Sequence, residues 1–456
     1  MHKRVNSRRT IPAVSKILEA LGHVDLPRPV IVATIRNELS VLRKSRRLPD
    51  FGDVLAHVRN VLDRHRRSRL QAVINGTGVI LHTNFGRAPL AHAAVDAVTQ
   101  IASNYANLEF DLPSGERGNR AAYLEHNLAI LCGAEAATVV NNCAAALVLI
   151  ARHFLKDNSK AIISRGEMVQ IGGGFRIGEI LGTENLHEIG ATNKTTIGDY
   201  TRAISKGTAV ILKVHRSNFF MDGFVDSPST EEIAQVARKR RIPFVVDLGS
   251  GAVEPVDAST SAERETTPAE ALKDGADLVC FSGDKLFGGP QAGVIAGKKR
   301  FVAALKREPL FRALRCDKLS LAGLQATIDL HLNAATSKIP TLALLQTAKD
   351  ELRGRAATIF ERLRGLPAQI TVGRGSGKVG GGTLPRSIVP SVTIDIAPDV
   401  CSVKEFATRL RNGVPPVIGY IANNYFKIDL RTVFPQQDEA VVDAIRSACS
   451  APISET

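Results

Sequence analysis

The sequence predicts an α/β protein in which a mostly parallel sheet is covered by helices on both faces. From Val73 onward, short apolar segments alternate with amphipathic stretches, and glycine-rich turns separate them. This alternation is typical of parallel sheets, because each parallel strand needs a crossover connection that is usually helical. The predicted strands are 137–140, 161–164, 209–214, 244–246 and 278–281.

The length of 456 residues predicts more than one domain, because a single core rarely grows beyond about 250–300 residues. We expect a helical domain over 1–70, a large domain that carries the sheet over 71–330, and a small α+β domain over 331–456. Further expected features are a helical region from about Asp317 to Leu363 that is interrupted at Pro340, a glycine-dense loop over 373–382, and strands at 391–396 and 426–430.

Most of the positive charge lies in the first 70 residues. They hold sixteen lysines and arginines against six aspartates and glutamates, a net charge of +10 out of the +14 of the whole chain. Three helices are predicted there, with basic clusters between and after them; the helices are 14–21, 29–42 and 51–62, and the clusters are 43–47 and 64–69. Such a module is suited to binding a polyanion, because each phosphate that its basic residues neutralise releases condensed counterions. A solvated basic face or linker explains the charge equally well.

The composition is that of a soluble globular protein, and it excludes an integral membrane protein. Hydrophobic residues make up 44% of the chain, but no apolar run approaches the roughly 18–20 residues that cross a bilayer. The basic N-terminus leads into no signal-type apolar core, so we expect a cytoplasmic protein. Six scattered cysteines without a CxxC pair predict reduced, mostly buried thiols and no metal site; they are Cys132, Cys143, Cys280, Cys316, Cys401 and Cys449.

Lys285 and Asp247 are the strongest candidates for catalytic residues. Lys285 follows the apolar segment 278–281 and a polar turn, and Asp247 ends the apolar segment 242–246. A lysine at the end of a strand suits a Schiff base, and a carboxylate there can keep the pyridine nitrogen of pyridoxal phosphate protonated. Because either residue alone is common at the rim of an α/β sheet, the prediction depends on the pair.

The segment Asn-Asn-Cys-Ala-Ala-Ala at 141–146 follows a predicted strand and opens an apolar helix. Backbone amides at a helix N-terminus bind anions, so this segment is the predicted cradle for the cofactor phosphate. Asn141 or Asn142 could instead be an ordinary helix N-cap. The other glycine-rich turns lack the spacing of a Walker or dinucleotide motif, which gives little support to a nucleotide-hydrolysing or NAD-dependent enzyme. The predicted cradle residues are Asn141, Asn142, Cys143 and Ala144.

Taken in order, the motifs resemble those of one family, the bacterial selenocysteine synthases or L-seryl-tRNA(Sec) selenium transferases. The resemblance implies the aspartate-aminotransferase-like fold (fold type I), pyridoxal 5'-phosphate on Lys285, and an N-terminal domain that recognises tRNA. It also implies a homo-oligomer, a decameric ring of dimers with sites at dimer interfaces. Cys143 departs from the asparagine that is more usual at its position. The matching stretches span almost the whole chain: 75–78, 81–90, 164–167, 175–177, 190–195, 214–219, 281–289 and 314–319.

The activity implied is a β-replacement on L-seryl-tRNA(Sec). Loss of the serine hydroxyl would give aminoacrylyl-tRNA, and selenium from selenophosphate would then yield L-selenocysteinyl-tRNA(Sec). Lys285 would act as the base and Asp247 would hold the ring protonated.

Six further residues are candidates for this site. Asp284 would act in catalysis, by orienting Lys285 or carrying a proton, and His215 and Ser282 would lie at the cofactor, although a structural hydrogen-bonding role explains Asp284 and His215 equally well. Guanidinium groups can grip the donor's oxygens bidentately, and the candidates for this are Arg87, Arg312 and Arg315. On sequence alone, an ordinary surface arginine is the favoured explanation of Arg312.

Two other classes of protein remain as alternatives. A pyridoxal-phosphate lyase acting on a free amino acid would explain Lys285 and Asp247, but it would leave the basic segment 1–70 without a role. A non-catalytic RNA-binding relative would explain that segment, but not the lysine, the aspartate and the glycine turns.

Overall fold

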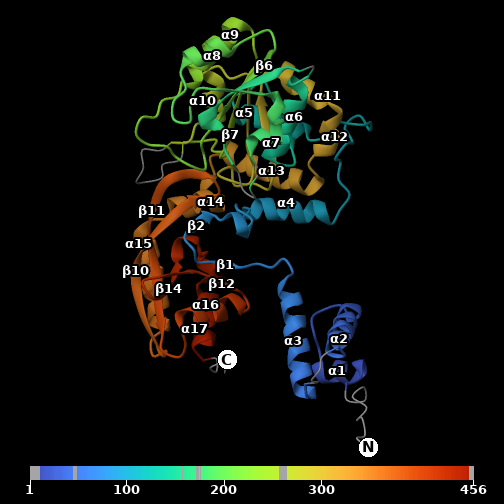
Figure 1. Cartoon of the computed structure of the whole chain (residues 1–456), viewed down its shortest axis with the longest axis vertical. Helices are drawn as coiled ribbons and strands as arrows, with labels where there is room; N and C mark the ends of the chain where they lie inside the picture. The colour runs from blue at the N-terminus through green and yellow to red at the C-terminus, as the bar shows by residue number, and fades with distance from the viewer. Residues whose placement is uncertain are drawn as a thin grey trace, which may run out of the picture. The chain divides into compact units, whose positions relative to one another are not determined.

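The computed structural model describes residues 11–44, 49–156, 158–170, 174, 176–255 and 264–450. The chain divides into two compact units, Met1–Val73 and Ile74–Thr456 (Figure 1). The predicted division of the second unit near residue 330 stays a prediction. Within the described residues, no helix is long and apolar enough to cross a membrane.

The first unit is built from three amphipathic helices, α1 (Val14–Leu21), α2 (Arg28–Leu42) and α3 (Phe51–Arg67). Their apolar faces meet in one small core that includes the fully buried Ile17 and Val58. All three predicted helices are confirmed, and α3 runs five residues beyond its predicted end at 62. The last turn of α3 is basic, and cations there interact favourably with the helix dipole. Part of the predicted cluster 43–47 falls outside the described residues.

The second unit contains a seven-stranded sheet in the order β3-β9-β8-β7-β6-β4-β5. All neighbours are parallel except the two pairs made by β9. The five predicted strands are confirmed, whereas β5 and β9 were missed. The strands are β3 (Ala136–Val140), β4 (Lys160–Ser164), β5 (Leu186–Ile189), β6 (Thr208–Val214), β7 (Phe244–Gly249), β8 (Leu278–Ser282) and β9 (Gly293–Gly297).

Helices cover both faces of this sheet, as its apolar strands require. Successive residues of β7 show this, because Phe244 and Val246 belong to one hydrophobic core and Val245 belongs to another. The helices of this region are α4 (His92–Ala102), α5 (Ala122–Leu131), α6 (Cys143–Phe154), α7 (Ile177–Leu181), α8 (Ile197–Ala203), α9 (Thr230–Arg240), α10 (Pro268–Lys273), α11 (Lys299–Arg307), α12 (Pro309–Leu314) and α13 (Lys318–Leu332).

The C-terminal part combines helices with a five-stranded sheet in the order β13-β14-β11-β10-β2. The predicted helical region is interrupted as expected, because α14 begins at Pro340, where the missing N–H costs nothing. The elements are α14 (Pro340–Gln346), α15 (Lys349–Arg362), β10 (Ala368–Gly380), β11 (Thr383–Pro398), α16 (Val403–Asn412), β13 (Tyr420–Ala422), β14 (Tyr425–Asp429) and α17 (Asp438–Ser450); β2 (Val79–Leu81) joins this sheet, and β1 (Ile74–Asn75) pairs with β12 (Val417–Ile418).

The glycine-dense loop predicted over 373–382 is wrong, because most of it is strand β10, which pairs with β11. The glycines at alternate positions of β10 leave room for side chains of other strands, which a larger residue would displace. A Cβ atom at Gly373 would lie 2.4 Å from Oδ2 of Asp395, and one at Gly375 would lie 2.6 Å from Oδ2 of Asp429. The true turn is 380–382, where all three glycines have positive φ.

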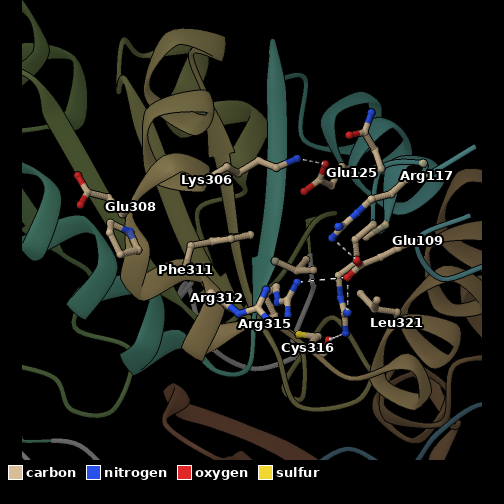
Figure 2. A pocket seen from close by; sticks show the side chains of 16 residues that line it. Glu109, Arg117, Glu125, Lys306, Glu308, Phe311, Arg312, Arg315, Cys316 and Leu321 are labelled. Atoms are coloured by element: carbon tan, nitrogen blue, oxygen red, sulfur yellow. Dashed lines mark hydrogen bonds and ion pairs between the residues drawn. The ribbon is translucent and has the colours of Figure 1, made fainter.

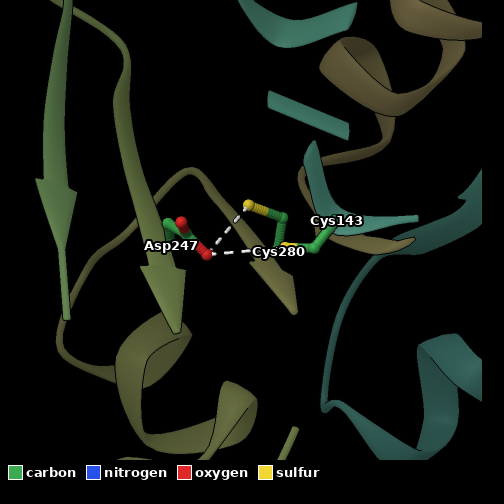
Figure 3. Close-up of side chains that lie close together, drawn as sticks. All are labelled: Cys143, Asp247 and Cys280. Atoms are coloured by element: carbon green, nitrogen blue, oxygen red, sulfur yellow. Dashed lines mark hydrogen bonds between the residues drawn. The ribbon is translucent and has the colours of Figure 1, made fainter. Parts of the chain in front are cut away.

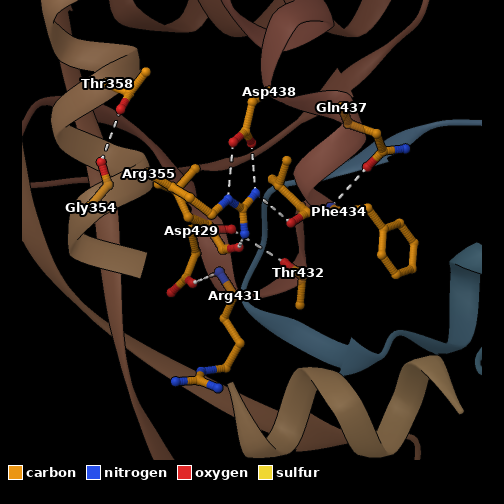
Figure 4. A network of polar contacts seen from close by, with 11 residues as sticks. Gly354, Arg355, Thr358, Asp429, Arg431, Thr432, Phe434, Gln437 and Asp438 are labelled. Carbon is orange, nitrogen blue, oxygen red and sulfur yellow. Dashed lines mark hydrogen bonds and ion pairs between the residues drawn. The ribbon is translucent and has the colours of Figure 1, made fainter. Parts of the chain in front are cut away.

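The buried Arg431 and the half-buried Arg355 join distant segments of the C-terminal part, and Figure 4 shows the bonds of Arg355 to Asp438. Arg431, which is 2% exposed, donates to the carbonyl oxygens of Leu344 at 2.7 Å and Pro390 at 2.6 Å. Arg355 of α15 holds both carboxylate oxygens of Asp438, at 2.6 and 3.0 Å. The contacts of Arg431 thus join α14 to β11.

Candidate active site

A cavity of about 430 Å³ lies at the carboxyl ends of β7 and β8, beside the first turn of α6. This is the edge of a parallel sheet at which ligands usually bind. The structure brings most of the predicted site residues together there. Those that line the cavity are Arg87, Asn142, Cys143, Ala144, His215, Asp247, Ser282 and Lys285.

Lys285 is half-buried in the turn that follows β8. Burial lowers the pKa of its amine and the nearby Arg87 charge lowers it further, whereas Cys143, Asp247 and Asp284 act in the opposite direction. A lowered pKa increases the fraction of unprotonated amine, which is the form that attacks a carbonyl.

Asp247 is a buried carboxylate near the end of β7, with 8% of its surface exposed. Its Oδ1 accepts three hydrogen bonds, from the backbone N–H of Gly249 at 3.1 Å and from the thiols of Cys143 at 3.6 Å and Cys280 at 3.7 Å (Figure 3). Burial raises the pKa of Asp247, and the Lys285 charge and these hydrogen bonds oppose that rise. A cation held against this carboxylate would offset the cost of its burial.

The first turn of α6 faces the same cavity. Asn142 is the N-cap of this helix, and its side chain accepts a hydrogen bond from the backbone N–H of Ala145 at 2.8 Å. The first amides of a helix have no intrahelical partner, so Cys143 and Ala144 present N–H groups suited to an anion. Asn141 is exposed, donates its backbone N–H to Leu314 and does not line the cavity.

His215 and Asp284 take different positions around Lys285. The backbone N–H of His215 donates to the carbonyl of Asp247 at 2.8 Å, and its Nδ1 lies 3.5 Å from Oε2 of the buried Glu265. Asp284 does not line the cavity and forms an ion pair with Arg87. Glu265 was not predicted. It lies fifty positions from His215 in the sequence, and nothing in the residues around it marks it as part of a site.

Arg312 and Arg315 line a second cavity, of about 480 Å³ (Figure 2). Glu109 lies at its centre, where Oε1 is 3.0 Å from Arg120 and 3.2 Å from Arg315. Hydrogen bonding to Arg120 is the main cause that lowers the pKa of Glu109. Arg312 enters no ion pair in the part of the chain that the structure describes. A single chain therefore does not bring these two arginines to Lys285.

Comparison with known proteins decides the family. Residues 73–434 match the family model described as L-seryl-tRNA selenium transferase. The chain belongs to this family. The L-seryl-tRNA(Sec) selenium transferase of Geobacter sulfurreducens is 41% identical over 96% of this chain and 99% of its own. The enzyme of the same name from Carboxydothermus hydrogenoformans is 41% identical over 94% and 95%.

Membership of the L-seryl-tRNA selenium transferase family confirms the resemblance seen in the sequence motifs, the aspartate-aminotransferase-like fold and the prediction that the chain is an enzyme. A solved structure of D-glucosaminate-6-phosphate ammonia-lyase is similar over 85% of this chain and 98% of its own, with a TM-score of 0.59 and 19% identity. At that identity the likeness supports the fold alone.

Proposed function

We propose that this protein converts L-seryl-tRNA(Sec) to L-selenocysteinyl-tRNA(Sec), with pyridoxal 5'-phosphate bound at Lys285 and selenophosphate as the selenium donor. The observation that carries the proposal is that Lys285, Asp247 and the first turn of α6 line one cavity of about 430 Å³. An amine, a carboxylate and an anion-binding helix end are the three groups that this cofactor needs.

The residues present fit the cofactor in size as well as in chemistry. Two glycines of the lining leave space beside the lysine, since a Cβ atom at Gly249 would lie 3.1 Å from Oγ of Ser217 and one at Gly382 would lie 3.1 Å from Cβ of Asn218. Nδ1 of His215 is buried without a hydrogen-bond partner among the described residues. Bound there, pyridoxal phosphate would supply an electron sink for chemistry at the α-carbon of the seryl group.

The residues of the chain then take distinct roles. With the cofactor bound, Asp247 would hold the pyridine nitrogen in its protonated form, and the amine of Lys285 would take the proton from the α-carbon of the seryl group. The C–O bond of the serine side chain breaks and the hydroxyl leaves as water. A C–Se bond forms at the same carbon while the Se–P bond of selenophosphate is cleaved by water, so phosphate is the second product. Arg87 and Asp284 set the charge beside Lys285.

The donor is a small polyanion, and arginines are suited to hold its oxygens. Arg87 lies in the Lys285 cavity, whereas Arg312 and Arg315 lie in the other one. We therefore propose that the last two act across an interface between copies in a decameric ring of dimers. Exposed apolar side chains support assembly, because Phe110, Leu112 and Tyr123 line one cavity and are 50%, 69% and 55% exposed, and contiguous apolar patches mark interfaces.

The N-terminal unit is proposed to bind the tRNA. Helix α3 ends in the basic residues Arg64, His65, Arg66 and Arg67. Arg66 pairs with Asp63 at 3.6 Å, but the side chains of Arg64 and Arg67 enter no ion pair within the described residues of this unit. Unpaired guanidinium groups are the ones available to phosphates. A tRNA-directed role also implies the cytoplasm as the place of action.

The test compares seryl-tRNA(Sec) with free amino acids. Protein reconstituted with pyridoxal phosphate should transfer selenium from selenophosphate onto seryl-tRNA(Sec), and it should leave free serine and cystathionine unchanged. Turnover of the free amino acids without transfer to tRNA would instead support the lyase alternative. No turnover of any of them, with no cofactor bound, would support the non-catalytic one.

A further inference from the structure

The hydrogen bonds at Asp247 are distributed unequally between its two oxygens. Oδ1 accepts from Gly249, Cys143 and Cys280. In the described part of the chain, Oδ2 has no partner, and the residue lines the cavity. The three donors therefore fix the plane of the carboxylate and leave one oxygen for a ligand.

The two thiols reach Oδ1 from separate elements. Cys280 lies in β8 directly beside Asp247 in the parallel register of β7 and β8, and it is fully buried. Cys143 is the first residue of α6 and is half-buried at the cavity. The two sulfurs and the carboxylate oxygen all lie within 4.8 Å of one another. Asp247 and Cys280 lie on neighbouring strands, and Cys143 begins a helix. The geometry of the contact therefore does not depend on a flexible loop.

The protonation state of the Cys280 thiol suits this role. Hydrogen bonding with Cys143, burial and the charge of Asp247 raise the pKa of Cys280 well above its ordinary value. A protonated thiol can donate, although weakly. The carboxylate needs such donors, because burial otherwise favours its neutral form. A neutral Asp247 could not hold a pyridine nitrogen in the protonated state.

We propose that Cys143 and Cys280 are positioning residues for Asp247, whose thiols together keep its carboxylate charged and turn Oδ2 toward the pyridine nitrogen of the cofactor. The inference rests on the proposed function, since it requires pyridoxal phosphate in this cavity. It assigns a task to two thiols that the proposed reaction does not itself use.

The experiment measures the protonation of the pyridine nitrogen directly. Protein would be reconstituted with pyridoxal phosphate that carries ¹⁵N in the ring, and its solid-state ¹⁵N signal would be recorded at neutral pH. The variants are Cys143→Ala with Cys280→Ala, and Cys143→Ser with Cys280→Ser, which keeps two donors. The matched control is Cys132→Ala, which removes a fully buried thiol from the hydrophobic core on the other face of the sheet without touching Asp247.

We expect the double alanine variant to shift the ¹⁵N signal toward that of unprotonated pyridine, because a carboxylate with fewer donors takes the shared proton. Its dissociation constant for the cofactor should rise about tenfold, on the order of one lost hydrogen bond to a charged group. The serine variant should return the signal toward the wild-type position, and the control should match wild type. If the double alanine variant fails to fold, the ¹⁵N signal of the single variant Cys280→Ala is compared with that of the double serine variant instead.

Three outcomes would overturn the inference or its premise. An unchanged ¹⁵N signal in every cysteine variant, with the cofactor still on Lys285, would reject the positioning role and leave the proposed function intact. A stoichiometric thiophilic metal in purified wild-type protein, lost in the double alanine variant, would show that the thiols serve as ligands instead. Absence of any bound cofactor in wild type would reject the proposed function itself.

Discussion

Nη1 of Arg87 lies 2.9 Å from Oδ2 of Asp284 and 3.1 Å from Oδ1 of the same carboxylate. Asp284 immediately precedes Lys285 and its side chain is only 9% exposed. After burial, which is the main cause of the lowered pKa of Lys285, the Arg87 charge lowers it further and the Asp284 charge raises it. The two charges of the ion pair therefore act on the Lys285 amine in opposite directions, and removing one of them leaves the other unopposed.

Replacing Arg87 with alanine should slow the attachment of the cofactor at neutral pH. The pKa of Lys285 would rise, so a smaller fraction of the amine could attack the aldehyde. The free energy of unfolding should fall by about 2–3 kcal/mol, because a buried carboxylate loses its partner. Stopped-flow absorbance at several pH values and urea unfolding measure the two effects.

The control for this prediction is the double change Arg87→Ala with Asp284→Asn, which removes both charges. It should recover most of the attachment rate and of the stability. An equally slow and equally unstable double variant would show that Arg87 acts through contacts other than this pair.

Asp247→Asn should stabilise the protein without cofactor and weaken cofactor binding. Burial raises the pKa of Asp247, so the folded state binds more protons than the unfolded state between the ordinary aspartate pKa of about 3.9 and the raised value. The stability that this carboxyl group contributes is thus present below its ordinary pKa. It is lost as the pH rises through the pKa that the group has in the folded protein.

At neutral pH the amide should therefore raise the free energy of unfolding of the cofactor-free protein by about 1–3 kcal/mol. The difference from wild type should shrink near pH 4, about the ordinary pKa. Urea unfolding at both pH values measures this, and cofactor affinity should fall at least about tenfold. A variant less stable than wild type at neutral pH would contradict the assignment of Asp247 as a strained, functional carboxylate.

Removing residues 1–73 should abolish tight binding of tRNA while cofactor binding persists. A finer variant, Arg64→Ala with Arg67→Ala, should weaken binding and reduce the slope of log affinity against log salt by about 1–2, as expected for one or two lost phosphate contacts. Arg66→Ala should have a smaller effect, because Arg66 already pairs with Asp63. Equal affinities for the shortened and full proteins at matched salt would exclude this role.

Arg312→Ala should separate the two halves of the reaction. Loss of the serine hydroxyl should persist, while use of selenophosphate should fall about 10- to 100-fold, the value of one charge-assisted hydrogen bond. Titration of selenophosphate against product formation measures this. Arg117→Ala is the matched control, since Arg117 lies in the same cavity but is 78% exposed and pairs with Glu109. Donor saturation like that of wild type would make Arg312 an ordinary surface arginine.

Local patterns predicted the framework of the site well. Lys285, Asp247 and the N-cap Asn142 follow apolar strands, and a strand followed by a polar turn is visible in sequence. Strand β9 was missed because three residues between two glycines carry little periodicity. Strand β10 was mistaken for a loop because it is rich in glycine. These glycines are explained by side chains of β11 and β14 that lie against them and are distant in sequence.

The partners of the site residues could not be predicted for a similar reason. The pairing of Arg87 with Asp284 joins residues 197 positions apart, and the Cys280 contact with Asp247 depends on the register of two strands. The place of Arg312 depends on how α12 packs. Such relations are set by tertiary packing, which single-sequence patterns do not encode.

The most direct test of the account is to locate the cofactor on the chain. Protein reconstituted with pyridoxal phosphate would be reduced with borohydride and digested, and the modified peptide would be identified by mass spectrometry. The account predicts modification at Lys285 alone, with no fixed cofactor and no selenium transfer to seryl-tRNA(Sec) in Lys285→Ala. Cofactor fixed at another lysine, or transfer that survives in Lys285→Ala, would contradict it.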